Sequence, residues 1–271
     1  MCGRYTLEMH LDALIAELKS FSTEFECVGD LEPLPRYNQA PTDIRPQRPP
    51  IVRSAPVLYR RNQTLCLEAL IWRLIPRWSG GQFTRYSTIN AKSESIVDSR
   101  MYQAPWFDNQ RCLIPATGVV EWQAQGLGPK QAFHIQLQDK IGTTNQPQPT
   151  TQNIPPLFFM AGIWEHSAHP NGKLEYSFSI LTTTPNRDFA PIHDRMPVII
   201  HPEHYLDWFH CSPDEALALC KPDPRPMQTT MIGRGINNPY ADSPDVLRPL
   251  NGADGDKQSS NTKAKDTDQQ V

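Results

Sequence analysis

The 271-residue sequence predicts an α+β fold, a single β-rich domain of mostly antiparallel, curved sheets with a few helices. Three observations favour this class. Short runs of alternating, β-branched or aromatic residues recur through the middle of the chain. Only two segments carry a helical pattern, and no internal repeat is present. The hydrophobic content of 38% is sufficient for a sizeable core.

The elements are predicted in chain order as follows. Apolar residues at helical spacing indicate a helix over 9–21, MHLDALIAELKSF. The segment 33–50 is predicted to be extended, because proline lacks the donor N–H and clashes with the preceding turn. The run 215–220, which follows Ser212-Pro213-Asp214, is predicted to be a short capped helix. Strands are predicted at 56–61, 65–72, 133–138, 157–165 and 176–183.

The domain is expected to span residues 1–240. Residues 142–156, GTTNQPQPTTQNIPP, separate two strand signals and are predicted to be a surface insertion. Residues 241–271 carry few apolar side chains and are expected to be a disordered tail.

Composition also bounds the location of the protein. No apolar run approaches the roughly 20 residues that span a bilayer, so no membrane association is expected. The first 20 residues include Arg4, Glu8, Asp12 and Glu17, which argues against a secretory signal. We therefore expect a cytoplasmic location, at the nucleoid of a bacterium, or a nuclear one in a eukaryote. The six scattered cysteines form no CxxC pair and are expected to be free thiols.

The charge is unevenly distributed along the chain. The net charge of −3 argues weakly against nucleic acid as a partner. From residue 36 to residue 111, however, the sequence contains twelve Lys or Arg residues and five Asp or Glu residues. A basic central third is what a phosphate-binding face requires, although a solvated surface of arginines explains it equally well.

The chain begins MCGRYTL, with a cysteine directly after the initiator methionine. If Met1 is removed, Cys2 carries both a free α-amine and a thiol. These two groups lie on adjacent carbons and can react with one aldehyde, which no internal cysteine can do.

Polar residues stand among apolar ones in four stretches: CGRY (2–5), INAKSES (89–95), CLIPATGVVEW (112–122) and APIHDRMPVII (190–200). Taken singly, each has a structural explanation. Asn90 fits a turn or cap residue, and Glu121 fits an outward-facing strand position or a buried carboxyl of perturbed pKa. His193 fits an ordinary core or surface histidine. Residues 196–200 fit a core strand.

Taken together and in order, these stretches resemble the SOS-response-associated peptidase (SRAP) family, over residues 2–240. The resemblance rests on MCGRY (1–5), RYNQAPT (36–42), WRLIPRW (72–78), NAKSES (90–95), SRMY (99–102), CLIPATGVVEW (112–122), AGIWE (161–165), TTTPNRDFAPIHDRMPVII (182–200) and WF (208–209). It implies the SRAP fold and a covalent link to abasic sites in single-stranded DNA. That link shields the lesion during the DNA damage response.

The resemblance also implies roles for individual residues. Cys2 would form the crosslink, and Asn90 would position the sugar and Cys2. Glu121 would act as the acid–base residue, and His193 would assist proton transfer in ring opening and in reversal of the link. The DNA contacts implied are Arg4, Asn38, Trp72, Pro76, Trp78, Lys92 and Arg100. Lys92 replaces an arginine common in relatives, so it keeps the charge and loses the bidentate fork.

The chemistry explains why these residue types are needed. An abasic deoxyribose is mostly a closed hemiacetal, so an acid–base group that opens the ring assists the reaction. The aldehyde condenses with the α-amine, and the thiol then closes a five-membered thiazolidine. Ordinary pKa values are about 7.7–8.0 for an α-amine and about 8.5 for a cysteine thiol. Both groups are therefore largely protonated near neutral pH, and a nearby carboxylate and imidazole can move the protons.

Other interpretations stay open from the sequence. The first is a peptidase with Cys2 as nucleophile, including removal of its own first residue. The second is a non-covalent binder of modified DNA. A metal site at 201–211 is suggested by His201, His204, His210 and Cys211, but no closed four-ligand spacing emerges. We expect no metal and no cofactor, a monomer, and crosslinking that chelators do not abolish.

Overall fold

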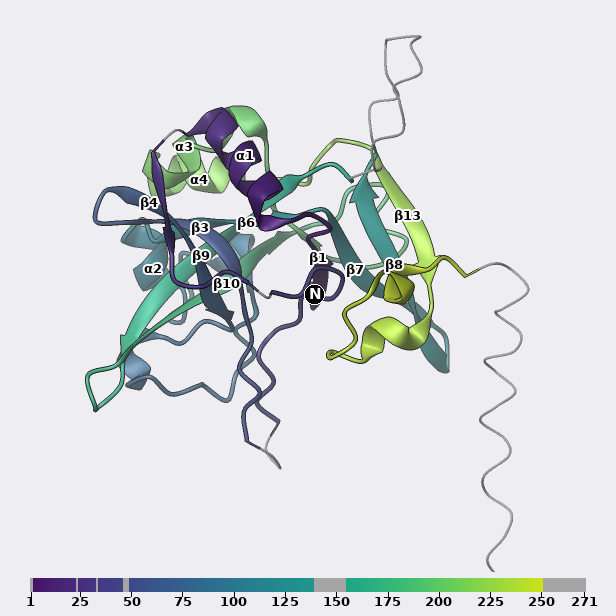
Figure 1. Ribbon diagram of the computed structural model, residues 1–271, viewed down its shortest axis with the longest axis horizontal. Coiled ribbons are helices and arrows are strands. Elements are labelled where there is room, and N and C mark those ends of the chain that lie inside the picture. Colours follow the sequence, from purple (N-terminus) through teal and green to yellow (C-terminus); the bar gives the residue numbers. More distant parts are fainter. Residues whose placement is uncertain (1, 23, 33, 46–48, 139–154, 251–271) are drawn as a thin grey trace, which may run out of the picture.

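Two β-sheets meet at the amino-terminal strand. The computed structural model describes residues 2–22, 24–32, 34–45, 49–138 and 155–250. In Figure 1 the larger sheet and its helices occupy the left half and the smaller sheet the right half, with β1 (Arg4–Thr6) between them. The predicted β-rich α+β class is confirmed.

The larger sheet closes on itself. Its continuous ring consists of β10 (Leu174–Thr183), β4 (Thr64–Trp72), β3 (Ser54–Arg61), β6 (Arg111–Ala116) and β9 (Phe158–Ala168), and β9 pairs again with β10. Additional strands attach at its ends: β2 (Phe25–Val28), β5 (Asn90–Lys92), β11 (Met196–Pro197) and β12 (Ile199–Ile200). Within the described residues, β10–β4, β10–β5 and β2–β4 are the parallel pairs.

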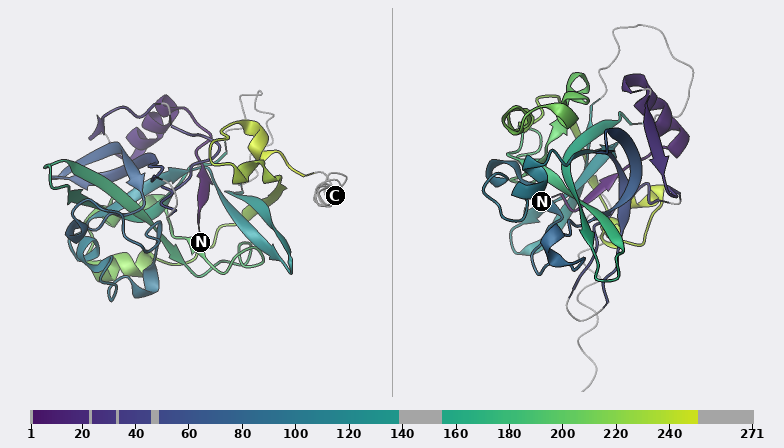
Figure 2. Two further views of the ribbon diagram at one scale, coloured as in Figure 1. Left: turned by 90° about the horizontal axis from the view of Figure 1, so that it is seen from below. Right: turned by 90° about the vertical axis from the view of Figure 1, so that its left-hand side faces the viewer.

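The smaller sheet has the order β1–β7–β8–β13. It is fully antiparallel and contains β7 (Gly118–Gln125), β8 (Gly128–Leu137) and β13 (Met227–Ile232). β6 and β7 are separated by one residue, so the chain passes directly from the larger sheet into the smaller one. This passage places β7 beside the amino terminus, as two further views also show (Figure 2).

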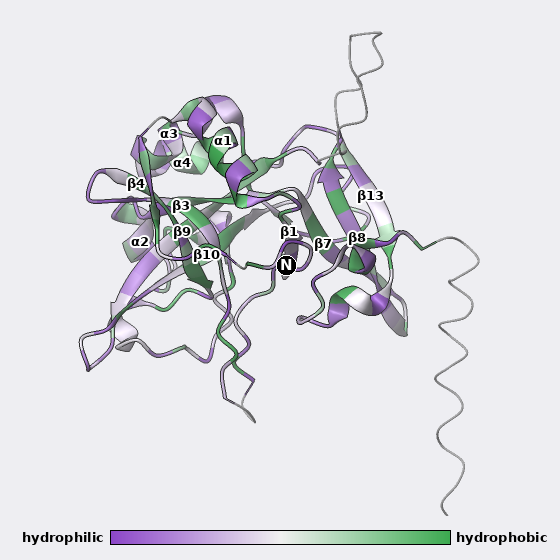
Figure 3. Cartoon of the chain, viewed as in Figure 1, coloured by the Kyte–Doolittle hydropathy of each residue, from purple (hydrophilic) through white to green (hydrophobic). Residues whose placement is uncertain are grey.

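The helices cover the larger sheet. They are α1 (Leu11–Phe21), α2 (Gln103–Phe107), α3 (Asp207–His210) and α4 (Pro213–Leu219). α1 buries Leu14 and Leu18 and is hydrophobic along one side only (Figure 3). Ser212 caps α4 through a reciprocal capping box with Glu215. Short 3₁₀ turns complete the set: Arg77–Ser79, Ser93–Ser95, Pro202–His204, Arg234–Asn237 and Pro244–Leu247.

Most predicted elements are confirmed within a few residues. These are the helix over 9–21, the capped helix near 215–220, the core strands at 196–200 and the five strands. Residues 34–45 and 49–50 contain no helix, as the prolines predict. None of the six cysteines, all within the described ranges, forms a disulfide. Among the described residues no helix is long and apolar enough to cross a membrane.

The predicted tail requires a correction. Residues 241–250 pack against the domain, since Val246 is 6% exposed and the Asp242 carboxylate accepts the backbone N–H groups of Arg36, Tyr37 and Asn38. Composition alone missed this segment, because a few specific contacts hold it, among them the Asp242 carboxylate, the buried Val246 and a backbone bridge between Pro249 and Ile232. Residues 251–271 and most of the expected 142–156 insertion lie outside the described residues.

Candidate active site

Cys2 lies against β7 and β5. The β1–β7 ladder pairs Arg4 with Val120, so continuation of the same register runs the first residues of the chain alongside Glu121. The Asn90 amide Nδ2 donates to the Cys2 carbonyl at 2.9 Å. Cys2 is 1% exposed, and its Sγ is 3.7 Å from the carbonyl oxygen of Arg4. The chain start is therefore held in place by backbone contacts on two sides.

Glu121 is a buried carboxylic acid near Cys2. It is 1% exposed on β7, and burial raises its pKa from 4.5 to about 7. Burial also raises the pKa of the Cys2 thiol, and the charge of Glu121 raises it further. At neutral pH the carboxyl can therefore give or take a proton, while the sulfur stays a thiol.

His193 is the third member of the site. Its Nε2 is 3.9 Å from Glu121 Oε2, and the side chain is 22% exposed. The backbone N–H of Arg195 donates to His193 Nδ1 at 3.0 Å, and the Asp194 carboxylate lies 2.9 Å from the same nitrogen. The backbone donor favours the neutral tautomer with its proton on Nε2, directed to Glu121, whereas Asp194 favours the imidazolium. Burial lowers the pKa of His193.

Asn90 begins β5 and is 8% exposed. Parallel pairing with Ile180 of β10 fixes its backbone, and its carbonyl accepts the Tyr102 hydroxyl at 3.0 Å. Its side-chain Oδ1 is buried and accepts no hydrogen bond within the described residues. An unsatisfied acceptor beside Cys2 is suited to a hydroxyl or ammonium of the reacting pair.

The structure thus brings together the four residues expected to be catalytic: Cys2 contacts Asn90, and Glu121 links Cys2 to His193. The arrangement supplies a proton donor and acceptor near neutral pKa beside a thiol at the chain start.

The histidines of 201–211 do not converge. The His201 ring lies 3.6 Å from Asp223, the His204 ring 3.4 Å from Asp207, and the His210 ring 2.9 Å from Arg60. Among the described residues no group of three His, Cys, Asp or Glu side chains is placed to hold a metal ion.

The expected DNA-contacting cations remain accessible. Lys92 and Arg100 are exposed, on β5 and shortly before α2. Arg4 is partly buried, and burial followed by the charge of Arg53 lowers its pKa to about 10. Its Nη1 donates to the Gly3 carbonyl at 2.7 Å, and its Nε has no partner within the described residues.

Three of the expected DNA contacts are buried in this structure and present no surface to a strand. Trp72 is 0% exposed, donates from Nε1 to Ile89 and stacks on Phe178. Pro76 is buried. Asn38 is 1% exposed, and its amide donates to Asn238 at 2.8 Å and to Ala241 at 2.9 Å. Asn38 therefore ties the domain to residues 236–241.

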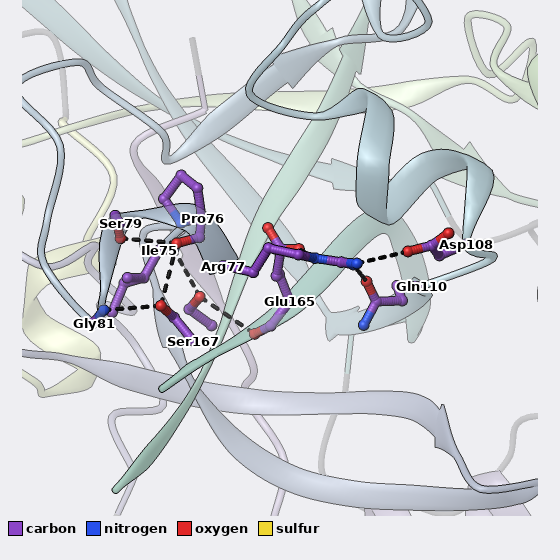
Figure 4. A network of polar contacts seen from close by, with 10 residues as sticks. Ile75, Pro76, Arg77, Ser79, Gly81, Asp108, Gln110, Glu165 and Ser167 are labelled. Atoms are coloured by element: carbon purple, nitrogen blue, oxygen red, sulfur yellow. Dashed lines mark hydrogen bonds and ion pairs between the residues drawn. The ribbon is translucent and has the colours of Figure 1, made fainter. Parts of the chain in front are cut away.

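Trp78 is 64% exposed, on the turn Arg77–Ser79. A polar network fixes this turn (Figure 4). The Arg77 guanidinium pairs with Glu165 and with Asp108, at 2.8 Å for the latter. Ser167 donates to the Pro76 carbonyl at 3.2 Å and accepts the Gly81 N–H at 2.9 Å. The charge of Arg77 is therefore balanced by ion pairs within the protein, and the turn that carries Trp78 is held in place.

Comparisons with known proteins identify the family of the chain. The family model described as "SOS response associated peptidase (SRAP)" matches residues 1–239. The chain belongs to the SRAP family. It is 30% identical over 251 residues to abasic site processing protein YoqW of Bacillus subtilis, covering 91% of this chain and 99% of that protein. It is 27% identical over 240 residues to abasic site processing protein HMCES of Mus musculus, covering 79% of this chain and 65% of that protein.

The fold agrees as well. A crystal structure of a protein from Bacteroides thetaiotaomicron superposes with a TM-score of 0.65 at 20% identity, covering 92% of this chain and all of that one. This likeness supports the SRAP fold.

Several residues around this SRAP site were missed from the sequence. Arg195 binds Glu94 through two hydrogen bonds of 2.9 and 2.7 Å, which ties the His193 loop to the turn after β5. The Thr6 hydroxyl lies 3.1 Å from His134 Nε2, and this hydrogen bond ties β1 to β8. Glu94 and Arg195 both lie inside recognised motifs, so their opposite charges were the available signal. His134 gave none, because its partner is 128 residues away.

Proposed function

We propose that this SRAP protein binds single-stranded DNA at an abasic site and forms a covalent thiazolidine through Cys2 after removal of Met1. The observation that carries the proposal is the contact set at the chain start, in which Asn90 holds Cys2 and a buried acid of near-neutral pKa stands beside it. Relatives named abasic site processing proteins support the same class of substrate.

The proposed reaction consumes one aldehyde and one aminothiol and releases one water. Glu121 and His193 exchange protons with the sugar O4′ as the hemiacetal opens. The neutral α-amine of Cys2 then adds to C1′, and loss of water gives an imine. The Cys2 sulfur attacks C1′, its proton passes to the former imine nitrogen, and a C–S bond closes the ring. Reversal runs through the same proton carriers.

The state of the thiol favours this order over a cysteine peptidase. A nucleophilic cysteine in peptidases is usually a thiolate whose pKa is lowered by a neighbouring cation. Here burial and the nearby Glu121 raise the pKa of the Cys2 thiol. An attack that begins at the amine does not require a thiolate.

Access is a condition of the mechanism. Because Cys2 is 1% exposed, the bound strand must displace part of its surroundings before C1′ reaches the amine. Because Cys2 and its neighbours are already held in place, the reaction loses less entropy once the sugar arrives.

On the DNA side we propose that Lys92, Arg100 and Arg4 hold backbone phosphates and that Trp78 stacks on a base. This combination of cations and an exposed aromatic ring is typical of sequence-independent single-strand binding. An abasic site offers no base edge to read, so affinity should depend steeply on salt.

The deciding experiment is intact mass spectrometry of the purified full chain, before and after incubation with a single strand that carries one abasic site. We expect loss of Met1, then an adduct of protein plus oligonucleotide minus one water. Cys2→Ser should form no stable adduct, while Cys112→Ser, which alters a cysteine buried in β6, should behave as wild type.

Three results would overturn the proposal. The first is a stable adduct formed by protein that retains Met1. The second is Cys2-dependent cleavage of a peptide without any adduct, which would favour the peptidase. The third is equal affinity of Cys2→Ser and wild type for modified DNA, again with no adduct, which would favour a non-covalent binder.

A further inference from the structure

Three arginines from separate segments meet beside the chain start. Arg4 lies on β1, Arg53 immediately before β3, and Arg73 immediately after β4. All three lie against residues 39–43. Tyr5, next to Arg4, exchanges backbone hydrogen bonds with Gln39 at 3.3 and 2.9 Å.

The guanidiniums of Arg53 and Arg73 hold neighbouring carbonyls of that segment. Arg53 Nη1 donates to Pro41 at 3.3 Å, and Arg73 Nε donates to Thr42 at 3.1 Å. The main chain of Arg53 also binds the Thr42 hydroxyl, which fixes the two segments together. Both cations are thereby tied to the same short segment, at two successive carbonyls.

The charge of this group is poorly compensated. The neighbouring acid is Asp43, which accepts Arg45 Nε at 2.9 Å and Arg45 Nη2 at 2.5 Å. Four guanidiniums therefore accompany one carboxylate, a net charge of +3. Arg4 Nε and Arg53 Nη2 have no hydrogen-bond partner within the described residues. An excess of positive charge raises the local concentration of anions, and guanidiniums form strong hydrogen bonds with phosphate oxygens.

The backbone of Arg73 is strained in the conformation that places its guanidinium here. Its φ is 153°, in a region that favours glycine. A side chain there costs on the order of 1–3 kcal/mol. The guanidinium reaches between the Thr42 carbonyl and the Tyr86 carbonyl, 3.1 Å from each. The positive charge of Arg73 acts on Tyr102, whose hydroxyl donates to the Asn90 carbonyl. Arg73 therefore lies on the Cys2 side of the molecule.

An exposed aromatic ring borders the cluster. The Arg53 guanidinium carbon is 5.1 Å from the centroid of the Tyr240 ring, which is 68% exposed. Cations and stacking rings are the two components of a single-strand binding groove.

We propose that Arg53 and Arg73 form, with Arg4, an additional binding site for a backbone phosphate of the bound strand, with Tyr240 as its aromatic border. The inference rests on the proposed function, because it extends the DNA-binding face around Cys2. It assigns binding roles to two arginines of the basic stretch 36–111 and to a tyrosine that the sequence analysis did not single out.

The test measures non-covalent binding by fluorescence anisotropy. The probe is a labelled single strand carrying one tetrahydrofuran, an abasic analogue without an aldehyde, titrated at several salt concentrations. Arg53→Gln and Arg73→Gly should each weaken binding about five- to tenfold at low salt and reduce the salt slope by about 0.7. The matched control is Arg248→Gln, which removes an exposed arginine paired with Asp245 and should keep the wild-type slope.

A second measurement separates binding from folding. Arg73→Gly relieves the backbone strain and removes the cation, so its melting temperature should stay at or above that of Arg73→Ala. Arg73→Lys should recover part of the affinity. If Arg73 only tethers the two loops, Arg73→Gly will lower the melting temperature without changing the salt slope.

Wild-type salt slopes in both Arg53→Gln and Arg73→Gly would overturn the inference. Wild-type protein is incubated in parallel with a reactive abasic strand. Failure of wild type to form an adduct contradicts the proposed function, whereas a normal adduct with unaffected variants contradicts only the phosphate site.

Discussion

Glu121→Gln is expected to stabilise the protein and to disable it. The carboxyl is 1% exposed, and burial raises its pKa from 4.5 to about 7. That rise corresponds to a penalty on the order of 3 kcal/mol for keeping the ionised form in the folded state. Glutamine has nearly the same shape and no charge, so it removes the penalty. The catalysed proton transfers should slow by about 10²- to 10⁴-fold.

The pH dependence has a definite sign. Between pH 4.5 and about 7 the folded state binds more protons at Glu121 than the unfolded state does. The free energy of unfolding of wild type therefore falls as the pH rises through this window. Below pH 4.5 the carboxyl is protonated in both states, so wild type and the Glu121→Gln variant should be equally stable. Above about pH 7 the variant should melt higher by about 6–12 °C, given a penalty of about 3 kcal/mol and roughly 2–4 °C per kcal/mol for a chain of this size.

Differential scanning calorimetry tests the stability at about pH 4, 6 and 8, which lie below, within and above the window. Adduct formation followed on gels tests the rate. Glu165→Gln is the matched control, because Glu165 is equally buried and its partner is the guanidinium of Arg77. That variant removes the buried one of the two carboxylates that pair with Arg77 and should lower the melting temperature at the alkaline end. A Glu121→Gln protein that is less stable than wild type there would refute the reasoning, as would an unchanged adduct rate.

Four further outcomes are expected. His193→Ala should slow adduct formation about 10²-fold with little change in melting temperature, since the side chain is partly exposed; rates are read from quenched time courses. Trp78→Ala should weaken single-strand binding by about 1–3 kcal/mol in anisotropy titrations and leave the fold intact, because the ring is 64% exposed. Asn38→Ala should destabilise the protein by about 1–3 kcal/mol in urea titrations by leaving buried carbonyls unsatisfied, with a normal adduct rate well below its melting temperature. Chelators should leave the amount of adduct, measured on gels, unchanged.

Local patterns in the sequence predicted the elements whose hydrophobic period is clear. The helix over 9–21 and the strands over 65–72 and 176–183 are of this kind, and each is present. β13 (Met227–Ile232) was missed, because its alternation is weak and pairing with β8 sustains it. Closure of the larger sheet through β9 and β10 was also beyond reach, since it depends on contacts between segments rather than on either segment.

The ordered motifs singled out the four residues that meet at the candidate site, whereas the exposure of the predicted DNA-contacting side chains was not predicted. Trp72 and Trp78 stand in the same motif, yet one is fully buried and the other 64% exposed. The difference comes from β4, which ends at Trp72, and from the turn that carries Trp78 outward. A tryptophan in a basic segment therefore indicates a stacking platform only when the end of the neighbouring strand is known.

The chain start is the part of the fold that most needs a physical explanation, because chain termini are usually poorly held. Three kinds of contact hold this one. β1 pairs with β7, the buried Tyr5 ring packs 5.4 Å from Trp72, and Thr6 bonds His134. Each of these contacts is made by a residue after Cys2, and the Asn90 amide holds the Cys2 carbonyl, so the backbone is fixed up to Cys2. Under the proposed function, loss of Met1 then frees the amine. The buried Trp72 therefore supports the site by packing against Tyr5 rather than by contacting DNA. Replacing it with a smaller side chain should loosen Cys2 before it weakens strand binding.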